Sequence, residues 1–502
     1  TTQTFWESPD SYFWHDALEH DVTIVGCGPA GMMLGGELAL AGVDVAIVER
    51  RENQEVEGSR ASGLHARSLE ILDQRGIADR FIQQGTKHYG APIAGTVIDT
   101  SDLPSRHNYT LALWQEKIEH TLFDWISELG VSVYRRSEAV RFRQDSDHVR
   151  LELHDARTIS SRYLVGCDGG RSGIRKMAGI GFSGHTPTCS SLIFEAEMEG
   201  EAPLGLRYGE HGTSAIGKLE DSVRLRGVVG EETLTSGDGP SEDDLRAALV
   251  AAYGSDFGVH NITWLSRFTD AARLATSYRE GRVLLAGDAA HVHSPVGGQG
   301  LNIGLQDAFN LGWKLAQVVK GVSPDRLLDT YHAERHPIGA ALLQTTLALS
   351  GLARGGARAE ALRSWVARLI RMDEPRRCYG ANISGLDIRY DLGDGHPLLG
   401  RRMPDIDLIT TEGPRRIFEL LHDGRPILLS LGGAGMSAKA MRAESVMRVG
   451  ATCAGICSLP VVGPVEMPTA ILVRPDGHVA WTGDGEDEDL DAAIQCWFGP
   501  GG

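Results

Sequence analysis

The fold of this chain is decided by the stretch Val22-Thr-Ile-Val-Gly26-Cys-Gly28-Pro29-Ala30-Gly31. Its apolar start predicts a buried strand, and the residues from Ala30 to Ala41 predict a helix directly after it. A second apolar run, from Val43 to Val48, predicts a strand that returns beside the first. A strand, a helix and a second strand in this order make a βαβ unit, which indicates a nucleotide-binding fold.

The glycines of this stretch follow the pattern Gly-x-Gly-x-x-Gly. Gly26 and Gly28 permit a tight turn and let the backbone approach a pyrophosphate, while Gly31 lets the helix pack closely on the strand. At Pro29 and Ala30 the start of the helix offers free amides and the positive end of the helix dipole. These five residues are therefore predicted to hold the phosphates of a nucleotide.

An acidic residue, Glu49, follows the second predicted strand and is itself followed by Arg50. A carboxylate at this position accepts hydrogen bonds from the ribose hydroxyls, which favours an unphosphorylated ribose. The tightly bound nucleotide is therefore expected to be NAD or FAD. We predict that Glu49 and Arg50 both line its site.

Two further strand-like runs end at a turn that contains glycine and aspartate. The first, Tyr163-Leu-Val165, leads into Gly166-Cys-Asp168-Gly169. The second, Arg282-Val-Leu-Leu-Ala286, leads into Gly287-Asp288-Ala-Ala-His-Val-His-Ser-Pro295-Val-Gly-Gly298-Gln-Gly300-Leu301-Asn302. An NAD dehydrogenase has neither motif. Both resemble the flavoprotein aromatic hydroxylases, and most closely the bacterial hydroxylases of aromatic polyketides, with a resemblance that runs from residue 21 to the C-terminus.

The resemblance implies FAD as the bound nucleotide and assigns residues to it. Asp168 and Gly169 would serve both FAD and a transient NADPH or NADH, and Asp288 would hold the flavin ribityl chain. Gln115 would contact the flavin chain, and Arg60 would reach the pyrophosphate or the ribityl. The segment that completes the implied flavin site contains Pro295, Gly298, Gly300, Leu301 and Asn302.

Physical chemistry favours the last of these segments as a flavin contact. Gly298 and Gly300, followed by a predicted helix, bring unobstructed amides and a positive dipole end to the flavin edge where negative charge collects on reduction. The resemblance places Pro295 beside the reactive face of the flavin as the candidate catalytic residue. It would assist through its carbonyl group and not through its side chain.

The resemblance also implies the reaction, which is that of an FAD-dependent monooxygenase using NADPH or NADH and O2. The enzyme would hydroxylate a polycyclic aromatic phenol through a flavin C4a-hydroperoxide, in natural-product biosynthesis or in antibiotic modification. Two alternatives stay open. One is a flavin-binding protein that inserts no oxygen and acts as a ligand binder, dehydrogenase or oxidase. The other is a Baeyer–Villiger monooxygenase, which would attack a ketone.

At 502 residues the chain exceeds the single-core ceiling of about 250–300 residues, so several domains are expected. We predict a mixed α/β (α+β) fold with a Rossmann-like FAD-binding domain, an inserted antiparallel or mixed sheet for the substrate, and a thioredoxin-like C-terminal domain. The predicted limits are 1–20 for an N-terminal extension, 21–185 and 276–394 for the two parts of the FAD-binding domain, 186–275 for the inserted sheet, and 395–502 for the C-terminal domain. Residues 90–111 are expected to contribute to the substrate domain.

The composition argues against several classes of partner. With 67 acidic and 49 basic residues, the formal charge of -18 opposes binding to nucleic acid or to anionic lipid. No apolar run approaches the roughly 20 residues that span a bilayer, and the first residues do not resemble a secretion signal. Seven scattered cysteines indicate reduced thiols. We expect a cytoplasmic monomer or homodimer without a membrane partner.

Several charged or polar residues that could suggest a further site are given no functional role. His291 and His293 are two positions apart and have no third ligand nearby, so we predict no metal site. Arg224 and Arg226 alternate on a predicted strand of the inserted sheet, where a solvent-exposed face is favoured over contact with a substrate. Asp307 in the long predicted helix is explained as well by helix polarity or packing as by flavin support. The same holds for Asn310.

Overall fold

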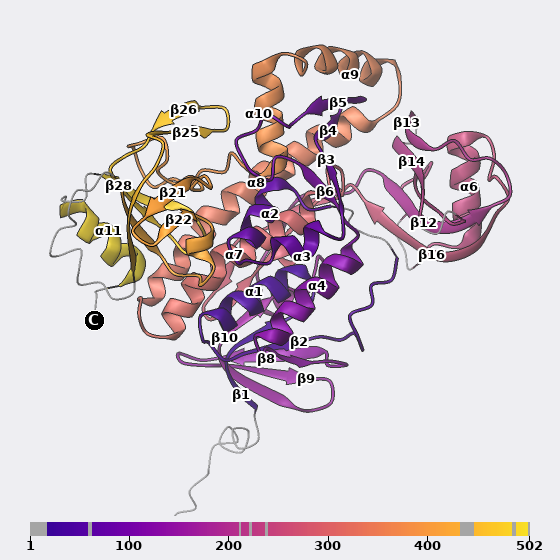
Figure 1. Ribbon diagram of the computed structural model, residues 1–502. Helices are drawn as coiled ribbons and strands as arrows, with labels where there is room; N and C mark the ends of the chain where they lie inside the picture. Colours follow the sequence, from indigo (N-terminus) through magenta and orange to yellow (C-terminus); the bar gives the residue numbers. More distant parts are fainter. Residues whose placement is uncertain are drawn as a thin grey trace, which may run out of the picture.

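The structure is a computed structural model that describes residues 18–58, 63–209, 212–219, 223–235, 239–431, 446–483 and 488–499. It is a mixed α/β molecule in which a central layered region lies between two others (Figure 1). A sheet with helix α6 extends from one side of the central region, and the C-terminal sheet with α11 lies on the other (Figure 1). Residues 1–17 and the predicted flavin contact Arg60 lie outside the described residues.

The central sheet has eight strands, with the main order β18-β19-β10-β1-β2-β7. The pairs from β19 through β7 are parallel, whereas β9 pairs antiparallel with β10 and β8 with β9. Strand β1 begins before the predicted Val22, because residues 18–20 also pair with β10. The strands are β1 (Leu18–Val25), β2 (Val45–Val48), β7 (Ser132–Tyr134), β8 (Ala139–Gln144), β9 (Val149–Leu153), β10 (Thr158–Gly166), β18 (Arg279–Glu280) and β19 (Val283–Leu285).

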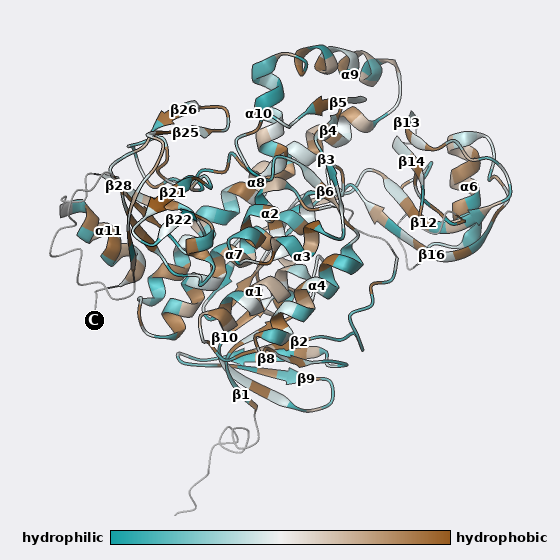
Figure 2. Cartoon of the chain, in the orientation of Figure 1, coloured by the Kyte–Doolittle hydropathy of each residue, from teal (hydrophilic) through white to brown (hydrophobic). Residues whose placement is uncertain are grey.

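Helix α1 (Pro29–Leu40) joins β1 to β2 and packs against α7 (Gln299–Val319) and α4 (Gln115–Glu128). Because α1 is apolar on nearly every side, it is buried among its neighbours. Figure 2 shows hydrophobic residues where helices and strands pack on one another. The short helices of this region are α2 (Ala66–Asp73), α3 (Ala78–Ile82) and α5 (Gly173–Met177).

The inserted sheet has five antiparallel strands in the order β13-β14-β15-β12-β16. Helix α6 (Glu242–Tyr253) packs on it around a separate core that includes Phe194, Val229 and Leu249. The strands are β12 (Ser190–Met198), β13 (Gly205–Gly209), β14 (Gly212–Lys218), β15 (Leu225–Gly230) and β16 (Val259–Thr269).

Smaller elements connect these regions. The hairpin of β4 and β5 packs with α8, α9 and α10 in one hydrophobic cluster, which includes Ile93, Leu349 and Ile383. The elements are β3 (Thr86–His88), β4 (Gly90–Ile93), β5 (Thr96–Asp99), β6 (Thr110–Ala112), β11 (Phe182–His185), β17 (Ala272–Ala275), η2 (Gly287–Ala289), β20 (His291–Val292), η3 (Asp325–Leu328), α8 (Asp329–Ala353), α9 (Ala357–Leu369) and α10 (Asp373–Ser384).

The C-terminal region contains a six-stranded sheet in the order β22-β21-β24-β23-β27-β28. Its helix α11 (Glu488–Phe498) packs on the central region, since the ring centroids of Trp497 and Trp313 lie 6.3 Å apart. The mixed α/β class is thus confirmed, and the thioredoxin-like character of this last region stays a prediction. The other elements are β21 (Asp407–Thr410), β22 (Gly413–Arg416), η4 (Glu419–Leu421), β23 (Ile427–Leu431), β24 (Met447–Thr452), β25 (Ile456–Leu459), β26 (Gly463–Glu466), β27 (Ala470–Val473) and β28 (Val479–Gly483).

Candidate flavin site

The three predicted motifs meet at one edge of the central sheet. The last residues of the parallel strands β2, β1 and β10 lie side by side, since Val25 pairs with both Val48 and Gly166, and Gly166 pairs with Leu285 of β19. The glycine turn, Glu49, the turn at Asp168 and the turn at Asp288 follow these strands. Ligands of open α/β sheets bind outside the carboxyl ends of the strands. The topology therefore brings the predicted site residues to one place.

The glycine turn is closely packed on one side and open on the other. A Cβ atom at Gly26, where φ is +110°, would lie 2.3 Å from the carbonyl oxygen of Cys167, and one at Gly31 would lie 2.0 Å from the oxygen of Gly26. Any side chain there would displace the backbone. A Cβ at Gly28, which precedes Pro29 and Ala30 at the start of α1, would have no atom within 4 Å. The open side of the turn is where the phosphates are predicted to lie.

Glu49 holds this turn in place. Its two carboxylate oxygens accept hydrogen bonds from the backbone amides of Cys27 and Arg51, each at 2.8 Å. A carboxylate oxygen can accept more than one hydrogen bond, so Glu49 keeps acceptor capacity for a ribose. The neighbouring Arg50 is exposed. The ribose contact predicted for Glu49 is compatible with this geometry.

Three side chains that the sequence did not single out support the same turn. The carbonyl of Cys27 accepts from Arg51 Nη2 at 2.9 Å and from Gln54 Nε2 at 3.0 Å. Glu119 of α4 accepts from Arg51 Nη1 at 3.0 Å and, through its other oxygen, from Gln115 Nε2 at 2.7 Å. The predicted flavin contact Gln115 therefore belongs to the network that holds the glycine turn. The spacing of Gln115 and Glu119, one helical turn apart, is the only sequence signal for this link.

Asp168 caps a helix and also faces the site. Its Oδ2 atom accepts from the amides of Gly173 at 2.7 Å and Ile174 at 3.1 Å, at the start of α5. Its Oδ1 atom is buried without a hydrogen-bond partner. Next to it, Gly169 has φ +79° and open space at the Cβ position. One carboxylate oxygen of Asp168 is thus committed to the fold, and the other is available to a ligand.

The turn at Asp288 lies beside the start of α7. A Cβ atom at Gly300 would be 3.7 Å from Oδ1 of Asp288 and 3.7 Å from Nε2 of His293. Asp288 is exposed, and Gly298 immediately before α7 has φ +64°. The carbonyl of Pro295 accepts from the amide of Gly298 at 3.0 Å. The carbonyl predicted to assist the reaction therefore also fixes the turn that leads into α7, next to the partly exposed Leu301.

Asn302 joins the start of α7 to the segment before α2. Its Oδ1 accepts from the amide of His65 at 2.8 Å and from the hydroxyl of Ser68 at 2.7 Å. Its Nδ2 donates to the carbonyls of Gly63 at 3.2 Å and Gly298 at 2.9 Å. Because the side chain is fully occupied and completely buried, it positions the α7 turn. A contact between Asn302 and flavin would have to use its backbone.

Beneath the Asp288 turn lies a buried ionic group that the sequence interpretation left undecided. Oδ2 of Asp307 accepts from the amide of Gly287 at 3.2 Å and lies 2.6 Å from Nε2 of His291. Oδ1 of Asp307 accepts from Nε of Arg335 at 2.8 Å. Arg335 and His291 hold the pKa of Asp307 below its usual value, although burial alone would raise it. Asp307 is therefore an ionised group that supports the flavin segment from below.

The residues present fit an FAD molecule. Buried polar atoms of proteins are nearly always hydrogen-bonded, yet Oδ1 of Asp168 and Nε2 of His293 are buried without partners at the proposed ribityl side. Gly28 and Gly169 leave open space at their own Cβ positions. Burial lowers the pKa of His293, so it stays neutral. Its Nδ1 donates to the carbonyl oxygen of Ser294 at 2.7 Å, so its orphaned Nε2 is left to accept a hydrogen bond from a ligand. His293 is a candidate cofactor contact, a role that the sequence did not indicate.

The inserted sheet turns an aromatic and charged face toward the flavin side. Glu195 pairs directly with Arg226 on one neighbouring strand and with Trp264 on the other, so the three side chains share a face. The guanidinium of Arg226 lies 5.1 Å from the ring centroid of Trp114, the residue before Gln115. Trp264 packs directly on the backbone of Gly58. The solvent-exposed face expected for Arg226 is therefore wrong, because its strand packs onto the central region.

Among the described residues, no group of three or more His, Cys, Asp or Glu side chains is placed to hold a metal ion. None of the described helices is both long and apolar enough to cross a membrane.

The fold and site together define a flavin-binding protein of the Rossmann type with an inserted antiparallel sheet. A family model described as FAD binding domain matches residues 19–346, and one described as aromatic-ring hydroxylase, C-terminal, matches residues 396–501. The chain belongs to this family of FAD-dependent aromatic-ring hydroxylases. It is thus a monooxygenase that uses FAD, with NADPH or NADH as reductant and O2 as co-substrate.

Three similar proteins illustrate the range of the family. Rifampicin monooxygenase from Rhodococcus hoagii is 40% identical, over 95% of this chain and 98% of that protein. The structure of OxyS anhydrotetracycline hydroxylase from Streptomyces rimosus has a TM-score of 0.89 and 39% identity, and covers 97% of this chain and 100% of its own. Dialkyldecalin synthase from Streptomyces rugosporus is 37% identical, over 96% of this chain and 100% of that protein.

Proposed function

We propose that this enzyme hydroxylates a polycyclic aromatic phenol of the polyketide type, in the synthesis of a natural product or the modification of an aromatic antibiotic. The observation that carries the proposal is the presence of two groups of side chains near the predicted flavin edge, which we call walls. The first wall consists of Trp264, on the inserted sheet, and Trp114, just before α4. The similar monooxygenases, named for rifampicin and anhydrotetracycline, support a substrate of this size.

The second wall is apolar and begins next to Pro295. Val296 packs with Leu349 and Ile383 in the hydrophobic cluster that contains the β4–β5 hairpin. A Cβ atom at Gly297 would be 3.2 Å from Cδ1 of Ile383, so this cluster reaches the turn that leads into α7. A flat, fused-ring ligand offers apolar faces to both walls, because aromatic stacking and burial of apolar surface favour such a ligand. Residues 90–111, which contain this hairpin, are accordingly proposed to complete the substrate domain.

Arg226 is the group on this face best suited to a phenol. Free phenols titrate near ~10, so attack by the ring carbon needs a pocket that stabilises the partial phenolate. Burial lowers the pKa of Arg226, while Glu195 opposes that shift, and the side chain remains a cation at neutral pH. A guanidinium beside the indole of Trp114 can donate to a phenolate oxygen and stack along an aromatic ligand.

The other steps of the reaction depend on the cofactor and on the residues that hold it. Bound FAD, once reduced, supplies the activation of dioxygen. The chain holds that cofactor through the glycine turn, Glu49, Asp168 and Asp288, and it presents the amides of Gly298 and Gly300 to the flavin edge that becomes negative. In the balanced reaction the phenol, O2, NAD(P)H and a proton yield the hydroxylated phenol, water and NAD(P)+. Pro295 orients the turn that faces the substrate.

The test is a screen of phenolic polycycles for stimulated NAD(P)H oxidation in air, with hydrogen peroxide measured in the same reactions. NADH and NADPH are compared at each step. We expect a productive substrate to consume reductant and O2 in equal amounts with little peroxide. Under oxygen-18 gas the product should carry one labelled atom. A protein that binds FAD but gives only peroxide with every phenol would contradict the proposal.

A second candidate function is ligand binding or cyclisation without oxygen insertion. It is favoured by the 37% identity to dialkyldecalin synthase and by the structure of the Diels-Alderase PyrE3, which has a TM-score of 0.84. A protein of this kind would change its ligand without consuming NAD(P)H. A Baeyer–Villiger reaction, in contrast, would consume it and convert a ketone to an ester, which fragmentation of the labelled product separates from a phenol.

Location and assembly complete the proposal. We infer a cytoplasmic enzyme that works as a monomer or homodimer. Its seven cysteines are free thiols, which is typical of proteins in a reducing compartment. Light scattering on the purified holoenzyme measures the number of subunits.

A further inference from the structure

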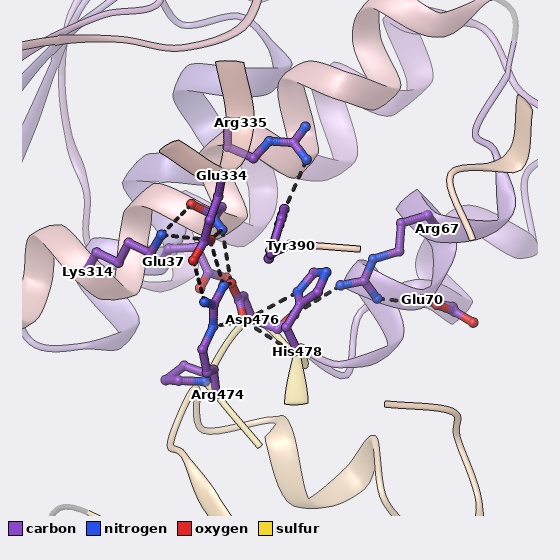
Figure 3. A network of polar contacts seen from close by, with 12 residues as sticks. Glu37, Arg67, Glu70, Lys314, Glu334, Arg335, Tyr390, Arg474, Asp476 and His478 are labelled. Carbon is purple, nitrogen blue, oxygen red and sulfur yellow. Dashed lines mark hydrogen bonds and ion pairs between the residues drawn. The ribbon is translucent and has the colours of Figure 1, made fainter. Parts of the chain in front are cut away.

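A turn of the C-terminal region is buried inside the FAD-binding part of the molecule. It runs from Arg474 to His478 between β27 and β28, and we call it the C-terminal turn. Arg474 and Asp476 have no exposed surface, and His478 is 4% exposed. Figure 3 shows these side chains pointing among Glu334, Lys314 and Tyr390, which come from other parts of the chain.

The side chains of the C-terminal turn form a dense ionic group with α7 and α8. Arg474 donates to both oxygens of Glu334, at 2.6 and 2.9 Å, and to Asp476 at 2.5 Å. Asn310 donates to Asp476 at 3.2 Å and to Glu334 at 2.7 Å. Lys314 donates to Glu334 at 2.8 Å. Removing charges from water is costly, so such a group adds little net stability, but the loss of one partner would leave an uncompensated buried charge.

The backbone of the turn is also held. Nη2 of Arg67 donates to the carbonyl of Asp476 at 3.0 Å, and Nη2 of Arg75 donates to that of Pro475 at 2.9 Å. Arg75 is in turn paired with Glu37 of α1 at 2.7 Å. Side chains of α2, α7 and α8 therefore converge on five consecutive residues of the C-terminal region, together with Arg75, which Glu37 of α1 holds in place.

From this group a continuous path leads to the flavin segment. Glu334 is followed on α8 by Arg335, whose Nε donates to Asp307, and Asp307 accepts from the amide of Gly287 beside Asp288. A second branch passes through Tyr390. Its hydroxyl accepts from Arg335 at 3.4 Å, and its ring stacks on His478 with centroids 4.3 Å apart.

We propose that the C-terminal turn is a positioning element for the flavin: through Glu334, Arg335 and Asp307 it sets the place of the Gly287–Asp288 segment and so the affinity and environment of bound FAD. The inference rests on the proposed flavin contacts of that segment. It gives the C-terminal region a part in cofactor binding, although that region lies on the far side of α7 and α8 from the inserted sheet (Figure 1). Arg474 and Asp476 act through other residues and are positioning residues.

The experiment compares two Asp→Asn variants of the full chain. Asp476→Asn removes a charge on the path. Asp405→Asn removes a charge between the C-terminal region and the rest of the chain that does not belong to the path. Asp405 is 3% exposed and pairs with Arg106 at 2.9 Å. FAD dissociation constants and the visible circular dichroism of bound flavin are measured for both. We expect Asp476→Asn to raise the dissociation constant about tenfold and to change the dichroism, whereas Asp405→Asn leaves both as in the parent.

A double-mutant cycle separates positioning from a general loss of structure. If the turn acts through Asp307, then Asp476→Asn should weaken FAD binding less than about twofold in an Asp307→Asn background. Equal weakening in both backgrounds would overturn the proposal, as would equal effects of Asp476→Asn and Asp405→Asn. If Asp307→Asn does not fold, Arg335→Lys takes its place in the cycle.

The proposed flavin site is tested in the same series by Asp288→Asn. An unchanged FAD affinity in that variant would refute the assigned segment itself. A weakened affinity in Asp288→Asn together with an unchanged one in Asp476→Asn would refute only the role of the C-terminal turn.

Discussion

The amide oxygen of Asn302 accepts the backbone N–H of His65 at 2.8 Å, and this bond ties the first turn of α7 to the start of α2. The amide nitrogen of the same side chain faces the carbonyls of Gly63 and Gly298. One side chain therefore holds two segments of the proposed flavin site. The orientation of its amide group is fixed, because donors face its oxygen and acceptors face its nitrogen.

We predict that Asn302→Asp destabilises the protein although it is nearly isosteric. The new carboxylate oxygen would face two carbonyl oxygens in a buried place, which costs about 2 kcal/mol or more. Urea denaturation of the FAD-free protein measures this free energy. Asn53→Asp is the control, because Asn53 is exposed and its amide oxygen accepts from the backbone N–H of Glu55, a bond that a carboxylate oxygen also accepts. Equal losses in the two variants would contradict the assigned role of Asn302.

The glycine turn gives a prediction that separates folding from cofactor binding. Gly28→Ala adds a methyl group to open space, so the unfolding free energy of the FAD-free protein should change by less than about 1 kcal/mol. The same methyl group would occupy the proposed pyrophosphate site, and FAD affinity should fall more than about tenfold. Gly26→Ala should instead destabilise the apoprotein, because its Cβ would meet the backbone of Cys167. A Gly28→Ala variant with normal FAD affinity would refute the phosphate site.

Arg226 is expected to determine substrate binding more than cofactor binding. In Arg226→Gln a charge-assisted hydrogen bond to a phenolate would be lost, so kcat/KM for the phenol should fall about ten- to a hundredfold. FAD affinity should stay within about twofold of the parent. The loss of kcat/KM should be smallest at high pH, where the phenol ionises by itself. Lys218→Gln, an exposed change at the end of β14, is the control. Steady-state oxygen consumption measures both variants.

The pH dependence of stability follows from buried histidines. Burial lowers the pKa of His478 to about 4, while an unfolded imidazole titrates near ~6.5. Between these values the unfolded state binds a proton that the folded state excludes, so the unfolding free energy falls as the pH drops from ~6.5 towards about 4. His65, whose pKa burial lowers to about 4, adds to the same decline.

We therefore expect His478→Gln to flatten the decline in that window, by at most about 1.4 kcal/mol per pH unit. Glu334 does not confuse the result. Although burial opposes it, Arg474 and Lys314 hold its pKa at about 2, so its contribution is lost only below ~4.3. Urea denaturation across the window is the measurement, with His148→Gln as an exposed control. If the unfolding free energy declines equally in His478→Gln and in the parent, burial does not keep the imidazole of folded His478 unprotonated, and the prediction is wrong.

The segments that are proposed to bind flavin could be named from the sequence, because each is a short run of neighbouring residues. The glycine turn needs its residues at fixed local spacing, and Asp168 and Asp288 each follow directly on a buried strand. Parallel pairing then brings these turns together without further information, since the carboxyl ends of parallel strands meet at one edge. The same reasoning locates Gly298 and Gly300 at the start of a helix. The resemblance to the aromatic hydroxylases that the sequence shows rests on these local patterns.

What the chain order could not decide is which distant side chains support those segments. Arg51 and Glu119 meet only because α4 packs on α1. Arg226 reaches Trp114 only because the inserted sheet folds back on the central region. Asp476 becomes buried because a turn of the C-terminal region enters between helices. Each of these contacts joins residues far apart in the chain, and a buried charge gives no local signal of the partner that neutralises it. The sequence by itself therefore determined the βαβ unit and its glycine and acidic turns, and only the tertiary structure decided the ionic groups that hold them in position.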